Sequence, residues 1–130
     1  MDVRQVNIIA LAYLGDAIYE VYIRNYLINK GIAKVENLQR EAIKFVSAKS
    51  QSKILDKLIQ NNYLANEEIE IVKRGRNYKR ESHPKNTDIG TYKMSTGFEA
   101  LFGYLYLDNK KDRIDEIMQY ILEEYNEKDY

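Results

Sequence analysis

Two carboxylates stand inside stretches that are otherwise largely apolar, and they are the residues best suited to chemistry. Asp16 lies in ALAYLGDAIYEVYIR (residues 10–24), and Glu99 lies in MSTGFEALFGYLYL (residues 94–107). Glu20 follows Asp16 by about one helical turn, so the two share a helix face. Because a buried Asp usually needs a partner, two apolar helices with one carboxylate each could satisfy both by holding a divalent cation. The alternatives are that Asp16 points outward, or that it pairs with a buried Arg or Tyr.

Both stretches have the apolar spacing of helices and lack the alternation of strands. Residues 100–107 carry no charge, so we expect this second helix to be buried on most sides. Small residues in the two stretches would let a neighbouring helix approach closely. They are Gly15, Gly97, Ala100 and Gly103.

The rest of the chain is also predicted to be helical, which gives an all-α fold class. Asn7 is the expected N-cap of the first long helix, which should end near Asn29, before Gly31. Further helices are expected over residues 37–45, around 54–59, from Asn66 as an N-cap, and over about 112–124. We expect residues 1–130 to form a single helical domain.

Composition excludes several classes of protein. The chain is 45% hydrophobic and 31% charged, which is ordinary for a folded domain. It has no cysteine and one histidine, which excludes a disulfide framework, a thiolate zinc site and a histidine-rich metal centre. The N-terminus does not resemble a signal peptide, and no apolar run is long enough to span a bilayer. We therefore expect a cytoplasmic protein with no membrane partner.

The net charge is zero, but basic residues gather in one segment. Residues 73–93 contain seven bases and two acids, whereas residues 108–130 contain eight acids and four bases. Glycines and the only proline predict an exposed, mobile loop over residues 75–91. Solvation alone would explain its charges, but its arginines, its interleaved tyrosines and its position before the Glu99 helix favour phosphate contacts. The candidate RNA-binding residues are Arg74, Arg76, Asn77, Lys79, Arg80 and Lys85.

YLGDAIYE (residues 13–20) together with FEALFGYLYLD (residues 98–108) resembles the two motif halves of the ribonuclease III catalytic domain. The chain length and KRGRN (residues 73–77) resemble the minimal bacterial branch of that family, Mini-ribonuclease III. The resemblance implies an all-helical catalytic domain, without a separate double-stranded RNA-binding domain, that cuts duplex RNA as a magnesium-dependent homodimer. It implies that Asp16 and Glu99 are catalytic and bind the metal, with Glu20 as a further candidate ligand. It also implies a role in the maturation of the 23S ribosomal RNA precursor.

The sequence departs from the family pattern at two positions. Ala12 and Thr96 stand where the family usually has carboxylates, which argues against a tightly bound second metal ion. The alternative is a catalytically inactive RNA-binding or ribosome-assembly subunit with the same fold, but such a subunit has no need of Asp16 and Glu99. A helical protein–protein adaptor would explain the acidic C-terminal segment but not the basic one.

Overall fold

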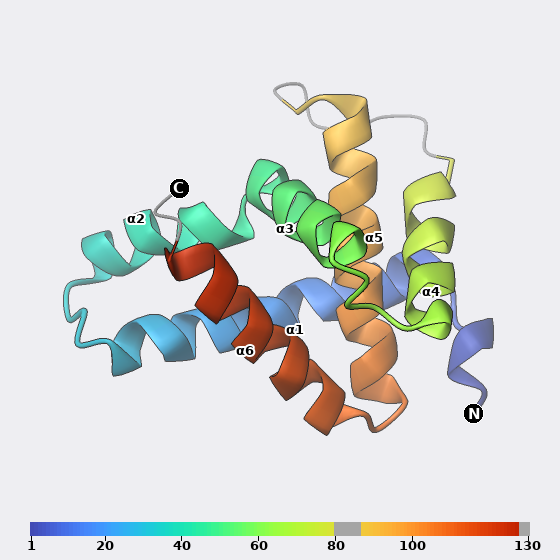
Figure 1. Cartoon of the computed structure of the whole chain (residues 1–130), viewed down its shortest axis with the longest axis horizontal. Coiled ribbons are helices and arrows are strands. Elements are labelled where there is room, and N and C mark those ends of the chain that lie inside the picture. The colour runs from blue at the N-terminus through green and yellow to red at the C-terminus, as the bar shows by residue number, and fades with distance from the viewer. Residues whose placement is uncertain (80–86, 128–130) are drawn as a thin grey trace.

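The computed structural model describes residues 1–79 and 87–127, and for residues 126 and 127 it describes the backbone only. Every regular element in these ranges is helical (Figure 1). The all-α prediction is therefore confirmed. A short 3-10 turn precedes the α-helices. The elements are η1 (Val3–Gln5), α1 (Ile8–Asn29), α2 (Val35–Val46), α3 (Ala48–Gln60), α4 (Asn66–Asn77), α5 (Ile89–Leu107) and α6 (Lys111–Glu127). No helix in the described part of the chain is long and apolar enough to cross a membrane.

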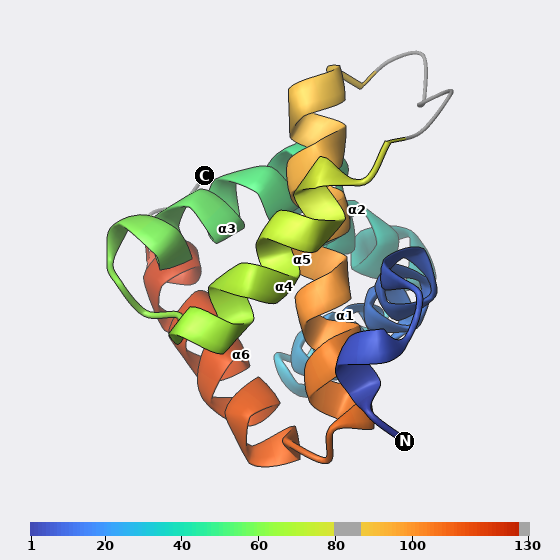
Figure 2. The same ribbon diagram turned by 90° about the vertical axis from the view of Figure 1, so that its right-hand side faces the viewer.

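Helix α5 is the centre of the molecule. It packs against α1, α3 and α4, and Figure 2 shows α4 crossing in front of it. Residues 95–105 of this helix are buried, with the exception of the half-buried Glu99. The Phe98 ring packs edge-on against the Tyr19 ring, with 4.8 Å between the centroids, and lies 4.9 Å from the Phe102 ring. The prediction of a helix buried on most sides is confirmed.

Helices α1 and α5 touch through their backbones. A Cβ atom added to Gly15 would overlap the carbonyl oxygen of Glu99, and one added to Gly103 would overlap the carbonyl oxygen of Leu11. Only glycine permits such an approach, because any side chain would push the two helices apart. The close helix contact predicted from the small residues is confirmed at both positions.

The sequence predicted a loop over residues 75–91, but α4 and α5 both extend into this range. Gly75 is a packing residue of α4 rather than a helix breaker. A Cβ atom added there would lie 2.8 Å from the Cα atom of Gly97, so the glycine allows α4 to cross α5 closely. The prediction of a loop is therefore wrong at both ends of this range, and residues 80–86 within it lie outside the described residues.

The predicted helix ends are correct in α1 but not in α4. The side chain of Asn7 accepts hydrogen bonds from the backbone of the first turn of α1, as predicted, and Gly31 follows that helix with a positive φ of 94°. Asn66 was predicted to cap α4, but it is the first helical residue, and Ala65 is the N-cap. Since Ala65 offers no side-chain acceptor, Glu68 completes the cap by accepting a 2.8 Å hydrogen bond from the Ala65 backbone N–H. Helix α6 starts one residue before the predicted range of 112–124 and continues beyond it to residue 127.

Glu68 also joins α4 to α6, a contact that the sequence pattern did not predict. The Arg113 guanidinium donates to both Glu68 carboxylate oxygens, at 2.8 and 2.9 Å, and to the Tyr63 carbonyl oxygen at 2.7 Å. Burial favours the protonated carboxyl, but the hydrogen bonds from Arg113 and the Ala65 backbone outweigh it and hold the pKa of Glu68 below its ordinary value. This pair fixes the start of α6 against α4.

Candidate active site

The crossing of α1 and α5 positions Asp16 and Glu99. Asp16 directly follows Gly15, whose backbone touches the Glu99 carbonyl group. The two carboxylates therefore belong to a single point of backbone contact, although they are more than eighty residues apart in sequence. Asp16 is exposed and Glu99 is half-buried, so the pair lies where the core meets the surface.

Asp16 has no hydrogen bond or ion pair within the described part of the chain. The sequence left open whether Asp16 is buried with a partner or points outward. Helix α1 is covered along one side only, and the side that carries Asp16 also carries the exposed Tyr13 and Ala17. The alternative that Asp16 points outward is the one the structure supports.

Glu20, the further candidate ligand, is held by a neighbouring charge. The Arg24 Nε atom lies 2.9 Å from the Glu20 Oε2 atom, in an ion pair across one helical turn. Among the residues that the structure describes, no group of three or more Asp, Glu, His or Cys side chains could hold a metal ion together. The assignment of Asp16, Glu99 and Glu20 as metal ligands therefore stays a prediction.

Ala12 and Thr96, where the family pattern usually has carboxylates, both face the core. Each is only 5% exposed. The Thr96 hydroxyl donates back to the Tyr92 carbonyl oxygen of its own helix at 3.0 Å. Both positions contribute to packing rather than to a polar site.

The basic end of α4 lies close to this crossing. Gly75 contacts the backbone of Gly97, two residues before Glu99 on α5, although residues two apart on a helix do not share a face. Arg76 is half-buried and donates to the Asn77 side chain at 3.2 Å. Asn77 and Lys79 are exposed. The described part of the predicted basic segment thus lies beside α5, and its role as an RNA contact stays a prediction.

The remaining candidate RNA-binding residues are Arg74, Arg80 and Lys85, and the structure describes only the first of them. Arg74 donates to the Arg4 carbonyl oxygen at 2.9 Å and to the Val6 carbonyl oxygen at 3.5 Å. Its guanidinium therefore ties the N-terminal segment to α4. Arg80 and Lys85 lie outside the described residues, so their assignment stays a prediction.

An exposed apolar face was not predicted from the sequence. Tyr13, Val21 and Ile28 of α1 are 84%, 62% and 58% exposed, and they recur at helical spacing. A groove of about 500 Å³ between α1 and α2 continues this face, with Val35 and Ile43 exposed on its α2 side. The signal in the sequence was that α1 is apolar around more of its circumference than one core contact requires.

Residues 9–110 match the family of the ribonuclease III domain. The chain belongs to the ribonuclease III family. It is 44% identical over 126 residues to Mini-ribonuclease 3 of Enterococcus faecalis, which covers 97% of this chain and 96% of that protein. It is 48% identical to Mini-ribonuclease 3 of Brevibacillus brevis, over 91% of this chain and 87% of that protein.

The fold of this ribonuclease III family member is also similar to a crystal structure of a Fusobacterium nucleatum protein. The TM-score is 0.84 at 34% identity, and the match covers 95% of this chain and 98% of that chain. The resemblance to the minimal branch of the family is confirmed, and the chain is an endoribonuclease.

Proposed function

We propose that this endoribonuclease cuts double-stranded RNA with Asp16 and Glu99 and requires magnesium. The observation that carries the proposal is Asp16 itself, an exposed carboxylate without a partner in the described part of the chain, at the backbone contact with Glu99. Asp is a poor helix former, and this one makes no hydrogen bond or ion pair with the described residues. Its position is therefore better explained by what it binds than by stability.

The side chains at the crossing fit a magnesium ion. Mg²⁺ takes oxygen ligands, commonly one or two carboxylates completed by waters and substrate phosphates. When bound, it would lower the pKa of a coordinated water and stabilise charge on the leaving oxygen. The exposed Asp16 carboxylate and the half-buried Glu99 carboxylate would be its two protein ligands.

The basic end of α4 is the proposed contact surface for the RNA backbone. We assign phosphate and 2′-OH contacts across the minor groove to Arg76, Asn77 and Lys79, with Arg80 and Lys85 as further candidates. Arg74 takes a smaller part, because it already binds two backbone carbonyl groups. In this proposal, residues 1–130 recognise the duplex without a separate double-stranded RNA-binding domain.

A homodimer is part of the proposal. The exposed apolar face of α1 and α2 supports it, because large exposed apolar faces mark contact sites. Tyr13 precedes Asp16 by one turn, so a second copy covering this face would adjoin the carboxylate pair.

We also propose the 23S ribosomal RNA precursor as substrate and the cytoplasm as location, and both rest on the motif resemblance alone.

Two charge-removing variants distinguish the proposed nuclease from the catalytically inactive alternative by their cleavage rates. Asp16→Asn and Glu99→Gln keep the side-chain shapes and remove the charges. If Asp16 and Glu99 bind the metal directly, each variant should lose more than about a hundredfold in cleavage rate, because even outer-shell partners of a metal cost 10–100-fold. An inactive subunit would show no cleavage that either variant could change.

The assay is cleavage of a labelled RNA duplex in magnesium, with duplex binding and thermal unfolding measured on the same samples. Asp16 is exposed, so Asp16→Asn should change the free energy of unfolding by less than about 0.5 kcal/mol. Asp112→Asn, at an exposed position of α6, is the matched control and should cleave like the parent. Cleavage near the parent rate by Asp16→Asn or Glu99→Gln would refute the assignment.

A further inference from the structure

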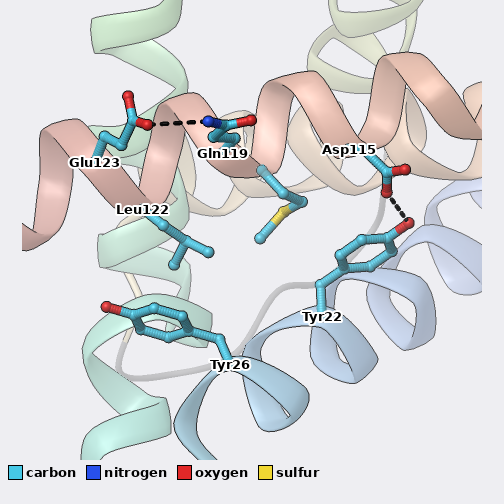
Figure 3. Close-up of a pocket in the computed structure, with 7 residues that line it drawn as sticks. Tyr22, Tyr26, Asp115, Gln119, Leu122 and Glu123 are labelled. Atoms are coloured by element: carbon cyan, nitrogen blue, oxygen red, sulfur yellow. Dashed lines mark hydrogen bonds between the residues drawn. The ribbon is translucent and has the colours of Figure 1, made fainter. Parts of the chain in front are cut away.

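A second groove lies between α1 and α6 (Figure 3), and its α1 residues differ from those of the exposed apolar face. Its volume is about 510 Å³. Tyr22 and Tyr26 form the α1 wall, one helical turn apart. The α6 wall repeats at helical spacing and consists of Asp115, Met118, Gln119, Leu122 and Glu123.

The groove has an apolar middle and an acidic residue at each end. Leu122 lies near the Tyr26 ring, with Asp115 at one end of the groove and Glu123 at the other (Figure 3). Met118 also lines the groove but is only 2% exposed. Eight residues of helix separate the two carboxylates, or about 12 Å along the axis.

The two carboxylates have only neutral partners in the described part of the chain. Asp115 accepts a 2.7 Å hydrogen bond from the Tyr22 hydroxyl, and Glu123 accepts one of 3.1 Å from the Gln119 amide. Burial, with the hydrogen bond to Asp115, raises the pKa of Tyr22 to about 12, so this hydroxyl remains a donor at neutral pH. Neither carboxylate therefore forms an ion pair with a base of the described residues.

We propose that the groove between α1 and α6 binds an amphipathic helix of a partner protein, with apolar side chains against the half-buried Leu122 and the two tyrosine rings and with Lys or Arg on Asp115 and Glu123. Grooves with an apolar floor and spaced anchor positions bind helices in this way. The tyrosine rings also suit a cation, since the Lys30 ammonium already lies 5.3 Å from the Tyr26 ring centroid.

Other occupants fit less well. RNA phosphates would be repelled by Asp115 and Glu123. A second copy bound by the same face would bring two acidic α6 surfaces together, which include the exposed Asp112 and Glu116. The site also needs neither RNA nor magnesium, so its test is independent of the proposed nuclease function.

The test uses a fluorescent peptide of about 14 residues, long enough for a helix of that groove's length, with leucine and lysine in a helical pattern. Its controls are the same peptide with glutamate in place of lysine, and a scrambled leucine–lysine peptide without an apolar face. The full-length protein should bind the first peptide and neither control, as measured by fluorescence anisotropy. Failure to bind the first peptide, or equal binding of the glutamate version, would overturn the proposal.

Three variants locate the binding. Asp115→Asn with Glu123→Gln should weaken binding about tenfold, since two partly exposed ion pairs are lost. Asp112→Asn with Glu116→Gln removes the same charge from the same helix outside the groove, and it should change binding less than twofold. Equal binding by these two double variants would also overturn the proposal.

The third variant separates docking from folding. Gln119→Lys places a cation in the groove, four residues from both Asp115 and Glu123. It should keep or raise the unfolding temperature through these helical pairs, yet weaken peptide binding as much as the groove double variant.

Amide signals in NMR spectra of the wild type should shift on peptide binding at Tyr22, Tyr26 and residues 115–123. Shifts confined to the α1–α2 face would place the peptide elsewhere and refute the assignment.

Discussion

Arg74 and Arg76 stand two positions apart at the end of α4 but have different surroundings. The Arg74 guanidinium binds the carbonyl oxygens of Arg4 and Val6, whereas the only hydrogen bond of the Arg76 side chain in the described residues is to its neighbour Asn77. Charge alone therefore does not identify an RNA contact in this segment. The residue that already satisfies backbone acceptors is more important for folding than for binding.

This difference leads to a prediction for duplex RNA binding. Arg76→Gln with Lys79→Gln should weaken binding and reduce the slope of log affinity against log salt by roughly one unit per lost phosphate contact. Arg74→Gln is the control: it should lower the unfolding temperature, because it leaves two carbonyl groups without their donor, and change the slope less. Filter binding at several salt concentrations measures both. An unchanged slope in the double variant would mean that these two charges face only solvent.

At the residue scale, the sequence was informative about residue types and less so about their surroundings. Asp16 and Glu99 could be singled out because a lone carboxylate in an apolar helix is unusual. An exposed Asp16 was one of the alternatives from the sequence, but the sequence could not decide between them, because exposure depends on which side of α1 other helices cover. The hydrogen bonds of Arg74 reach back some seventy residues to the short 3-10 turn at the N-terminus, and no local sequence pattern predicts such a contact.

At the scale of elements, the α1–α5 crossing depends on glycine. A Cβ atom on Gly15 would overlap the Glu99 carbonyl oxygen, and this oxygen belongs to a backbone that cannot rotate away. We predict that Gly15→Ala destabilises the fold by about 2–3 kcal/mol, although alanine is the better helix former. Cleavage should fall further than the loss of folded protein explains, because the helices that carry Asp16 and Glu99 are pushed apart.

Denaturant unfolding and the cleavage rate per folded molecule measure the two effects separately. Gly90→Ala is the matched control in the first turn of α5, where the nearest group to an added Cβ atom is the flexible Asp88 carboxylate at 3.3 Å. This variant should unfold and cleave like the parent. If Gly15→Ala retained parental stability and rate, the backbone contact would not be what positions the pair.

Most helices could be predicted from the sequence, and the one large error has a physical cause. Gly75 was taken to open a loop, because glycine breaks helices in isolation. In the structure it allows α4 to approach Gly97, and the gain from packing outweighs its low helix propensity. The start of α5 did have a local signal, since the Asp88 side chain accepts a hydrogen bond from the Thr91 backbone N–H at 3.1 Å.

At the scale of the whole molecule, different surfaces suit different partners. The exposed apolar face lies on α1 and α2, and the acidic groove lies between α1 and α6. Helix α6 is also distant from the basic end of α4 (Figure 1). RNA, a second copy and a basic helix could therefore bind without competing for the same residues.

The proposed homodimer should depend on the apolar face. Tyr13→Ser with Val21→Ser removes two of its most exposed side chains and should convert the dimer into monomers, as measured by sedimentation velocity. Tyr78→Ser with Ile89→Ser is the control, because these side chains are 40% and 50% exposed outside that face. A monomeric parent protein, or a serine variant that remains dimeric, would contradict the proposed interface.

The last prediction concerns how the metal and the RNA bind together. The described residues offer two carboxylates rather than a cluster of three or more, so we expect the protein to hold magnesium weakly without RNA. Phosphate oxygens of the duplex would complete the coordination shell, and metal and RNA should then each increase the affinity for the other. The magnesium concentration that gives half-maximal cleavage should accordingly fall as the RNA concentration rises.

Calorimetric titration of the RNA-free protein with magnesium tests this directly, without reference to activity. The parent should show weak heats, and Asp16→Asn should remove them. Glu20→Gln should leave both the heats and the magnesium dependence of cleavage nearly unchanged, because Glu20 is held by Arg24 at 2.9 Å. Two tight magnesium sites per subunit in the parent would refute the prediction, and a loss of either site in Glu20→Gln would show that this carboxylate leaves Arg24 to bind the metal.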